Sequence, residues 1–579
     1  MPLVAIGFTA MSTLVHAAPT QNSNEPVYPG AGALQQELQR QVPKLQPLPT
    51  PSAPKAPAKP KEAKPSEVKV TIKGFRIDGN KTLSEELIKE TLKPWLGKTV
   101  AFEELQKAAD SVAALYQTQG FLAQVSVPPQ RITDGIVILK VLEAKLGAVN
   151  VDMPNGPSRF GEDKARRYIT DANRLSEIVQ TRNIERSIYI LNETPGIAVA
   201  SQLQPGKNEG EVDINLSLAD TKPVRGRVEW NNNGSRPTGT GQRVVNLIFD
   251  GFSGNGDQLA ASNIKSDGSD YSLASYSVPL NSDGLRAGIS GSYLDYSNVN
   301  KFRNSNAGFG RAKTVGVNLT YPTLRSAAAN SNITASFDRK MYLNKQMSTG
   351  DISSDYRIEN MVFGYNANQY DQWLGGGVTQ GSISMTKGHI TFGSDTKKLQ
   401  ADAPTSAFGV DTPTTFTKFN ASLSRAHQVV PDKTILNINV SGQMSSVDLD
   451  PAEKFYLGGP NGVKGYPGSQ ASGSQGAMLN VELQQALEDN VIASAFYDIG
   501  FVQQYKNKAL YEESLGAANS YSLRSAGLGL KRPGKDFIWS VSVNWKLGHN
   551  PLLAQGGKGV NNDGRSNSAY VWANVQWVF

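Results

Sequence analysis

Two charged residues, Lys464 and Asp498, stand in patterns that could bring them together. Lys464 lies in the glycine-rich segment 455–467, whose glycines allow tight turns and positive φ angles. Asp498 lies in Phe496-Tyr497-Asp498-Ile499-Gly500. A carboxylate enclosed by a folded protein needs a partner, so we expect an ion pair if the segment folds inward. Otherwise the segment is an ordinary surface loop.

The remaining reactive residues do not suggest an enzyme. Cysteine is absent, which excludes disulfides, thiolate catalysis and zinc–thiolate sites. Four histidines are scattered without metal-ligand spacing: His16, His389, His427 and His549. We therefore expect no catalytic residue, no metal and no cofactor. The net charge of +7 is spread thinly and much of it lies in one Pro/Lys segment, so no nucleic-acid partner is expected either.

Strands with one apolar face are the elements that must position the charged pair. In residues 568–579 one face is apolar and the other carries Asn574 and Gln576. The apolar face consists of Val571, Ala573, Val575, Trp577 and Phe579. Such a strand is typical of a transmembrane β-barrel, where lipid touches one face and water the other. Aromatic residues near strand ends, Trp545, Tyr570 and Trp577, are predicted to lie at the membrane boundary.

From residue 223 onward the chain is predicted to form sixteen strands in all, including 568–579, and some of them alternate less perfectly than this one. Charged residues make up 19% of the chain and mean hydropathy is −0.36, which argues against a helical membrane protein. The predicted strands are 224–232, 242–251, 258–266, 272–280, 285–297, 312–323, 331–345, 354–372, 377–390, 414–429, 434–446, 476–487, 491–504, 520–532, 537–548 and 568–579. An even count brings both ends of a 222–579 barrel to one side. The connection 447–475, which contains Lys464, then lies on the far side, and alternation places Asp498 in the lumen.

The first half divides into a leader, a spacer and two repeats. Residues 1–17 resemble a secretory signal whose start could be truncated, followed by a flexible tail at 18–30. Segment 31–42 is a short helix candidate, and 43–66 is a Pro/Lys-rich linker with extended character. Residues 67–144 and 145–221 each follow the order β-α-α-β-β, which constitutes an internal repeat.

In the first repeat we expect a strand at 68–77, helices at 84–96 and 102–116, and strands at 125–128 and 136–142. In the second we expect a strand at 146–151, helices at 163–171 and 182–192, and strands at 197–203 and 212–218.

Together these features resemble the outer-membrane transporters of two-partner secretion, the TpsB family of the Omp85 superfamily (ShlB/FhaC/HecB-like, with a contact-dependent inhibition CdiB-type member as one option). Each β-α-α-β-β unit resembles a POTRA domain. Val463-Lys464-Gly465-Tyr466 is similar to the V-R-G-[YF] motif of the sixth extracellular loop, with lysine in place of arginine. Because lysine lacks the bidentate geometry of arginine, this departure implies a weaker or hydrated contact with the partner carboxylate. Phe496, Asp498 and Gly500 match the partner motif on a lumen strand.

The resemblance implies roles for three sets of residues. The loop cation would pair with Asp498 inside the pore. The helix at 31–42, with Leu34, Leu38 and Arg40, would plug the pore, although a Gln-rich tail is the alternative from the residues alone. The terminal Val575, Trp577 and Phe579 would close the barrel and serve as the signal to the barrel assembly machinery.

The expected function is therefore export of a large TpsA-type protein across the bacterial outer membrane, with POTRA domains in the periplasm. The domains would capture an unfolded adhesin, haemolysin or contact-dependent inhibition toxin by adding it to a sheet edge. Passage would need no nucleotide hydrolysis. The expected partners are this cargo, outer-membrane lipid and the assembly machinery. The alternatives are an outer-membrane protein insertase, a passive porin and, weakest, an enzyme lodged in a barrel.

Overall fold

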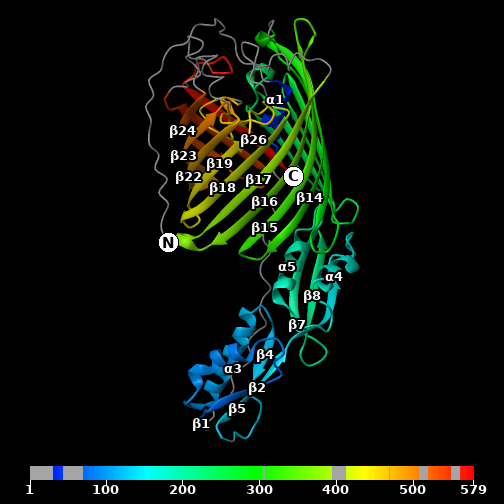
Figure 1. The fold of residues 1–579 in the computed structure, drawn as a ribbon, viewed down its shortest axis with the longest axis vertical. Helices are drawn as coiled ribbons and strands as arrows, with labels where there is room; N and C mark the ends of the chain where they lie inside the picture. The colour runs from blue at the N-terminus through cyan, green and yellow to red at the C-terminus, as the bar shows by residue number, and fades with distance from the viewer. Residues whose placement is uncertain are drawn as a thin grey trace.

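The protein is a barrel with two small domains in line below it, as the computed structural model shows (Figure 1). The structure describes residues 30–42, 69–132, 134–303, 307–393, 413–468, 470–506, 519–548 and 561–579. The predicted signal 1–17, the linker 43–66 and all but the last residue of the tail 18–30 lie outside these residues.

Sixteen antiparallel strands close into the barrel in chain order, with the last strand beside the first, which confirms the predicted fold class. They are β9 (Val224–Asn231), β10 (Gln242–Asp250), β11 (Gln258–Lys265), β12 (Ser269–Pro279), β13 (Arg286–Ser297), β14 (Gly308–Arg325), β15 (Ala329–Gln346), β16 (Ile352–Asp371), β17 (Gly377–Phe392), β18 (Thr415–Val430), β19 (Thr434–Ser445), β22 (Gln475–Ala486), β23 (Ile492–Gln503), β24 (Ser520–Arg532), β25 (Phe537–Lys546) and β26 (Ala569–Val578). Short 3₁₀ turns in the barrel's connections are Arg236–Thr238, Asn300–Phe302, Trp373–Gly375 and Glu488–Asn490.

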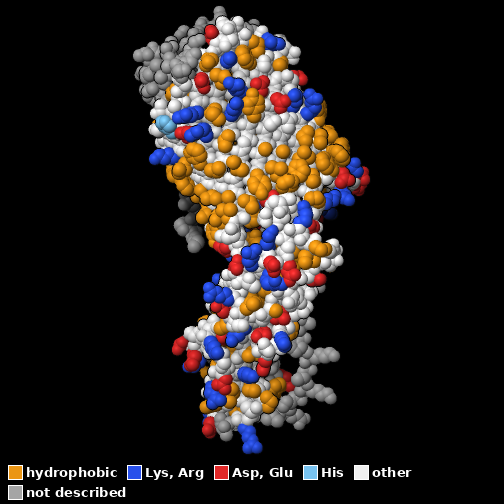
Figure 2. Space-filling model, turned by 90° about the vertical axis from the view of Figure 1, so that its right-hand side faces the viewer, with side chains coloured by type: hydrophobic (Ala, Val, Ile, Leu, Met, Phe, Trp, Pro, Cys, Tyr) orange, Lys and Arg blue, Asp and Glu red, His pale blue; other side chains and the backbone are white. Residues whose placement is uncertain are grey.

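Alternation along the strands produces the expected outer surface. On β14, Val315, Val317 and Leu319 point outward and are about half exposed. Thr314, which points into the lumen, is buried. On the face shown in Figure 2, hydrophobic side chains form a band across the barrel, with charged side chains above it and on the two domains below. No helix within the described ranges is long and apolar enough to cross a membrane.

The first small domain has a split strand where one continuous strand was predicted. It contains β1 (Lys69–Thr71), β2 (Gly74–Asp78), α2 (Glu85–Leu92), the 3₁₀ turn Lys93–Trp95, β3 (Thr99–Ala101), α3 (Phe102–Thr118), β4 (Ala123–Ser126) and β5 (Ile136–Glu143). The prediction of one strand at 68–77 is wrong, because β1 pairs with β3 while β2 pairs with β5. The chain changes partner at Ile72, which is fully buried in the core.

The second domain follows the predicted β-α-α-β-β order, without the additional short strand β3 that separates the two helices of the first domain, and it is tied to the barrel. It contains β6 (Lys145–Asp152), α4 (Glu162–Thr170), α5 (Thr181–Asn192), β7 (Ile197–Pro205) and β8 (Glu211–Asp220), with β7 at a sheet edge. From α5, Arg186 pairs with Asp283 in the β12–β13 turn and donates to the Pro322 carbonyl at 2.6 Å. Lys164 donates to the Gly254 carbonyl in the β10–β11 turn at 2.8 Å. These turns therefore mark the near end of the barrel, and the opposite end is called the far end below.

A short helix, α1 (Ala31–Gln39), lies inside the barrel toward its far end (Figure 1). It is shorter than the predicted segment 31–42. With apolar side chains at few positions it could not form a core by itself, but the barrel wall supplies the rest of the apolar surface. Leu34 and Leu38 are 1% exposed.

Candidate functional site

The long connection between β19 and β22, residues 446–474 and called loop 6 below, folds into the barrel lumen. Within it, β20 (Phe455–Tyr456) pairs with β21 (Ser472–Gly473) to form a small hairpin. Gly459 takes φ +103°, a conformation that favours glycine. Val463 and Tyr466 are fully buried in a cluster with Leu457. The loop therefore occupies the pore rather than the solvent at the far end.

The tip of loop 6 is bound to the barrel wall by the predicted pair. Lys464 Nζ lies 2.9 Å from Asp498 Oδ1, and the Lys464 backbone N–H donates to Asp498 Oδ2 at 3.1 Å. Lysine thus contacts both carboxylate oxygens with two different groups, which replaces the fork of an arginine. The two side chains meet directly, so the alternative of a hydrated contact is wrong, while the alternative of a weaker contact stays a prediction. Lys464 Nζ also lies 4.3 Å from the centroid of the Phe496 ring, a cation–π contact.

Asp498 belongs to a row of polar residues that lie opposite one another on neighbouring strands. The row consists of Asn480, Asp498, Ser525 and Lys546, and is called the polar row below. Asn480 donates to Asp498 Oδ1 at 2.7 Å, and Ser525 donates to Oδ2 at 3.0 Å. With the two groups of Lys464, the carboxylate therefore has four donors. Because it is 0% exposed, these donors replace its hydration. Sequence reasoning found the two ends of the pair but missed Asn480 and Ser525, since only strand register brings them to the carboxylate.

Both glycines of the predicted motifs lie where a side chain would collide. A Cβ on Gly465 would lie 2.7 Å from Ser525 Cβ, and a Cβ on Gly500 would lie 2.5 Å from Leu457 Cδ2. Close approach of the loop to the wall therefore depends on these two residues. The Trp572 indole donates to the Lys464 carbonyl at 2.8 Å, which ties the tip to β26 as well.

The base of loop 6 is bound to the opposite wall by a charge that sequence analysis missed. Glu453 pairs with Lys340 of β15 at 2.8 Å and with Lys418 of β18 at 2.6 Å. Asn360 donates to the same carboxylate at 2.8 Å. Glu453 is 2% exposed, so two lysines compensate one enclosed carboxylate. Burial alone would raise the pKa of Glu453, but the two lysines outweigh it and hold that pKa well below its usual range.

Helix α1 lies between loop 6 and the wall, and touches both. The Ala31 N–H donates to Asn344 Oδ1 at 2.8 Å, and the Gln35 amide donates to Ser292 and Thr314 at 3.1 and 3.0 Å. On the loop side, the Gln36 amide donates to the Lys454 carbonyl at 3.0 Å. This last contact places the helix directly against the base of loop 6.

Of the three residues predicted for the plug helix, Arg40 differs from the two leucines. It follows the last helical turn and is exposed, and its carbonyl accepts a long bond of 3.4 Å from Asn461 of loop 6. Leu34 and Leu38 are instead buried against the barrel wall.

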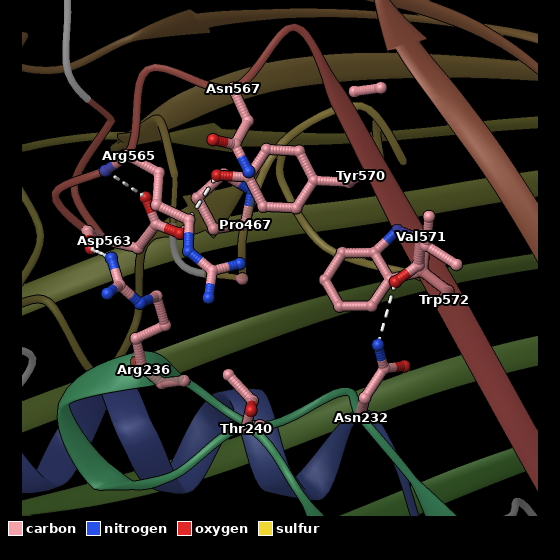
Figure 3. A pocket seen from close by; sticks show the side chains of 14 residues that line it. Asn232, Arg236, Thr240, Pro467, Asp563, Arg565, Asn567, Tyr570, Val571 and Trp572 are labelled. Carbon is pink, nitrogen blue, oxygen red and sulfur yellow. Dashed lines mark hydrogen bonds between the residues drawn. The ribbon is translucent and has the colours of Figure 1, made fainter.

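A cavity of about 350 Å³ lies at the far end, between loop 6, the β9–β10 connection and β26 (Figure 3). Arg236 donates to the Asp563 carbonyl at 2.7 Å on one side of it. Tyr570 donates to the Asp563 carboxylate at 3.0 Å and stacks on Trp572. The prediction that Tyr570 lies at the membrane boundary is therefore wrong, because alternation along β26 directs it inward.

The predicted terminal residues lie on the outer face and close the barrel. Val575, Trp577 and Phe579 are all exposed, as are Trp545 and Val571. The Phe579 and Gly226 backbones exchange two hydrogen bonds of 2.9 and 3.0 Å. The β26–β9 ladder has only five pairs, from Asn574↔Asn231 to Val578↔Arg227.

Among the described residues no group of three or more His, Asp or Glu side chains is placed to hold a metal ion. The arrangement is thus a lumen filled by a helix and a loop, each held by specific contacts that can be broken.

Comparisons with known proteins match this architecture. The family model described as haemolysin secretion/activation protein ShlB/FhaC/HecB matches residues 210–531, and a ShlB-type POTRA domain model matches residues 70–144. The heme/hemopexin transporter protein HuxB of Haemophilus influenzae is 26% identical over 481 residues, covering 81% of this chain and 82% of its own. The outer membrane transporter CdiB of Dickeya dadantii is 23% identical, covering 83% of each chain.

Solved structures show the same fold. CdiB from Escherichia coli superposes with a TM-score of 0.72 at 19% identity, covering 94% of this chain and 98% of its own. BamA from Haemophilus ducreyi, without its first three POTRA domains, gives a TM-score of 0.52 at 14% identity.

Proposed function

The chain belongs to the haemolysin secretion/activation family ShlB/FhaC/HecB and is an outer-membrane transporter that secretes a partner protein, and from this we propose that its filled lumen is the resting state of the export pore. Its POTRA domains lie in the periplasm, so the far end of the barrel is extracellular. In the resting state α1 and loop 6 occupy the path that the exported chain must take. Export then requires both to leave or shift.

The observation that carries this proposal is the reversible character of the contacts. Loop 6 is held at its tip by Lys464–Asp498 at 2.9 Å and at its base by Glu453 with two lysines. Helix α1 is held by hydrogen bonds and by a few apolar side chains, chiefly Leu34 and Leu38. No covalent bond fixes either element, because the chain contains no cysteine.

We propose that capture occurs at the free edge of β7 in the second POTRA domain. The sheet order β6-β8-β7 leaves one side of β7 unpaired within the sheet. The Val199 N–H donates to Asn192 rather than to β8, at 2.8 Å, so by alternation the N–H groups of Ser201 and Leu203 also point to the free edge. An extended segment of cargo could pair with this edge by β-strand addition.

The cargo is proposed to be a large secreted protein of the TpsA type, such as an adhesin, a haemolysin or a contact-dependent inhibition toxin. The names of the two relatives differ: one is a heme/hemopexin transporter protein, and the other is the outer membrane transporter CdiB. We therefore propose the class of cargo and not one member of it. We propose that no nucleotide is hydrolysed and that folding of the cargo outside draws it through the pore. The exposed aromatic residues Trp577 and Phe579 are proposed as the signal to the barrel assembly machinery, and outer-membrane lipid as the partner of the outer band.

The insertase alternative is less supported. The likeness to BamA shows the fold alone, whereas the family match and both relatives are transporters. If this protein were an insertase, deleting its gene would stop the assembly of other barrels and leave secretion of the partner protein intact. That result would favour the alternative.

The test is secretion of the large protein encoded beside this gene, with the full chain and with residues 69–220 removed. Loss of secretion with a normally inserted barrel supports capture by the POTRA domains. Undiminished secretion would overturn it. Ser201→Pro removes one edge N–H without breaking the β7–β8 ladder, and Ser201→Ala is the matched control. Secretion should fall with Ser201→Pro only.

A further inference from the structure

The lumen wall that seats α1 carries a row of apolar residues that lie directly opposite one another on seven consecutive strands. Barrel lumens of this kind are usually polar, because they face water. This row, called the apolar row below, runs from β10 to β16. It consists of Val244, Ile264, Tyr271, Leu294, Ala312, Tyr342 and Tyr356.

Each member of the apolar row is buried in the resting state, with exposures of 0–6%. The row continues past Tyr356 to Phe392 on β17, and the rings of Tyr342, Tyr356 and Phe392 follow one another at centroid distances of 5.0 and 6.4 Å. In the full cluster, Leu34 and Leu38 of α1 and Ala452 of loop 6 cover parts of this surface.

The row is longer than α1 needs. Neighbouring strands are about 4.8 Å apart, so seven strands span about 29 Å. A nine-residue helix is only about 14 Å long. Helix α1 therefore covers only part of the row, and Leu449 and Ala452 of loop 6 cover another part. When both elements leave, one longer occupant would fit the whole row.

The direction of the row suits a chain in transit. It runs perpendicular to the strands, and barrel strands tilt by roughly 35–45° from the barrel axis. The row therefore climbs the wall obliquely toward the far end. An extended polypeptide rises about 3.3 Å per residue, so about nine residues could lie along 29 Å.

Polar groups beside the row show what kind of occupant it accepts. Asn344 accepts a backbone N–H of α1 at 2.8 Å, and Ser292 and Thr314 accept from a Gln35 side-chain amide. Ser292 and Thr314 lie opposite one another, two residues along their strands from Leu294 and Ala312 and on the same face. These groups bind peptide-like amides in general, without requiring a particular sequence.

We propose that the apolar row is a binding surface for extended segments of the exported polypeptide, and that α1 occupies part of it at rest. This rests on the proposed export function. Aliphatic and aromatic side chains of the passing chain contact the row, while its amides reach Asn344, Ser292 and Thr314. Many weak contacts of this kind hold a chain without fixing its register, so the chain can slide.

The first experiment places a photo-crosslinking phenylalanine analogue in the full-length protein at Tyr271 or Tyr342. The same analogue at Tyr570, an aromatic residue facing the lumen on β26, is the matched control. The probe is the adjacent large secreted protein, stalled in transit by a fused domain that folds in the periplasm. We expect cargo cross-links at Tyr271 and Tyr342 at least about fivefold above those at Tyr570. Cross-links to α1 at Tyr271 should fall as cargo cross-links rise.

The outcomes separate this inference from the proposed function. Cross-links at Tyr570 alone would overturn the inference and leave pore export standing. Absence of cargo cross-links at every lumen position, with secretion intact, would overturn the pore route itself.

The second experiment removes the plug as an explanation. In a variant lacking residues 31–42, Leu294→Gln makes the row polar when no plug can be seated there. We expect secretion to fall at least about threefold relative to the plug-less parent, with the barrel inserted to the same level. Ile289→Gln, on the outer face of the same strand, controls for strand stability. If Leu294→Gln has no effect without the plug, the row serves only to seat α1 and the inference is wrong.

Discussion

The two walls of the lumen hold their occupants in opposite ways. The wall from β10 to β16 presents the apolar row and packs against α1 with aliphatic and aromatic side chains. The wall from β22 to β25 presents the polar row and binds one residue of loop 6, Lys464, through a fully buried carboxylate. Apolar contact is non-directional and tolerates many occupants, whereas a buried ion pair requires one geometry. One wall is thus suited to a changing occupant and the other to a single fixed one.

Loop 6 joins the two walls. Its tip lies on the polar row, and its base reaches Lys340 of β15, on the other wall beside α1, and Lys418 of β18, between the two walls. The predictions below test whether the walls differ as described, beginning with the change that should have the largest effect.

Asp498→Ala should have the largest effect on secretion. It leaves Lys464 Nζ and the donors Asn480 and Ser525 without their acceptor. Removing one partner of a buried pair costs about 3–5 kcal/mol. Because the tip of loop 6 then has no defined position to which it can return after each displacement, we expect secretion to fall at least about tenfold, equivalent to about 1.4 kcal/mol. Secreted cargo per inserted barrel is the measurement.

Its control is Glu482→Gln, which removes a charge from the same lumen wall. Glu482 accepts a hydrogen bond from Gln484 on its own strand, at 3.1 Å. Equal losses from the two variants would show that Asp498 has no special role.

Glu453→Gln should mainly open the resting pore. Two buried lysines lose their countercharge, and the base of loop 6 loosens next to the Gln36–Lys454 contact. We expect ion conductance in planar bilayers to rise several-fold, with a smaller loss of secretion than for Asp498→Ala. Glu359→Gln, which breaks a pair with Arg339 on β15 and β16, should leave conductance unchanged.

The pH dependence of conductance should show the depressed pKa of Glu453. A carboxyl whose folded pKa lies below its unfolded value stabilises the closed state at all pH values above the unfolded pKa, about 4.3. That stabilisation is lost only as pH falls through the lower, folded value. Conductance should therefore stay constant from pH 7 to about 4.3 and rise at more acid pH. A rise already between pH 6 and 5 would contradict the anchoring role.

Lys464→Arg should have the smallest effect. The backbone N–H of residue 464 already occupies Asp498 Oδ2, so a guanidinium gains little from a second N–H. We expect secretion within about twofold of the parent. Lys464→Ala serves as the reference for complete loss of the cation, and a large effect of the arginine variant would show that the lysine geometry itself matters.

Much of the fold could be predicted because period-two alternation specifies both the strands and their faces. The inward position of Asp498 and the outward positions of Val575 and Trp577 follow from it. Even Tyr570 could have been placed correctly, because it shares parity with Asn574 and Gln576 on β26.

The apolar row and the Glu453 anchor could not be predicted in this way. The row depends on which residues face one another across six strand pairings, and register is set by turns and closure rather than by any single strand. Glu453 depends on the path of loop 6, and its two lysines come from strands far apart in the sequence. The split of the first strand at Ile72 is similar, since a distant partner, β3, decides it.

The short ladder between β26 and β9 has a consequence for the stiffness of the barrel. It has five pairs and, beside them, the two Phe579–Gly226 backbone bonds, whereas β15 and β16 share seventeen pairs. Backbone hydrogen bonds resist shear and bending in proportion to their number, so the cross-section is stiff along the wall that seats α1 and compliant at the closing strands. On this compliant side, Trp572 of β26 donates a hydrogen bond to the Lys464 carbonyl, so loop 6 contacts the closing strand from inside the lumen. When the tip of loop 6 leaves, this contact is lost, and we expect any widening of the lumen to occur at the β26–β9 side rather than along the apolar row.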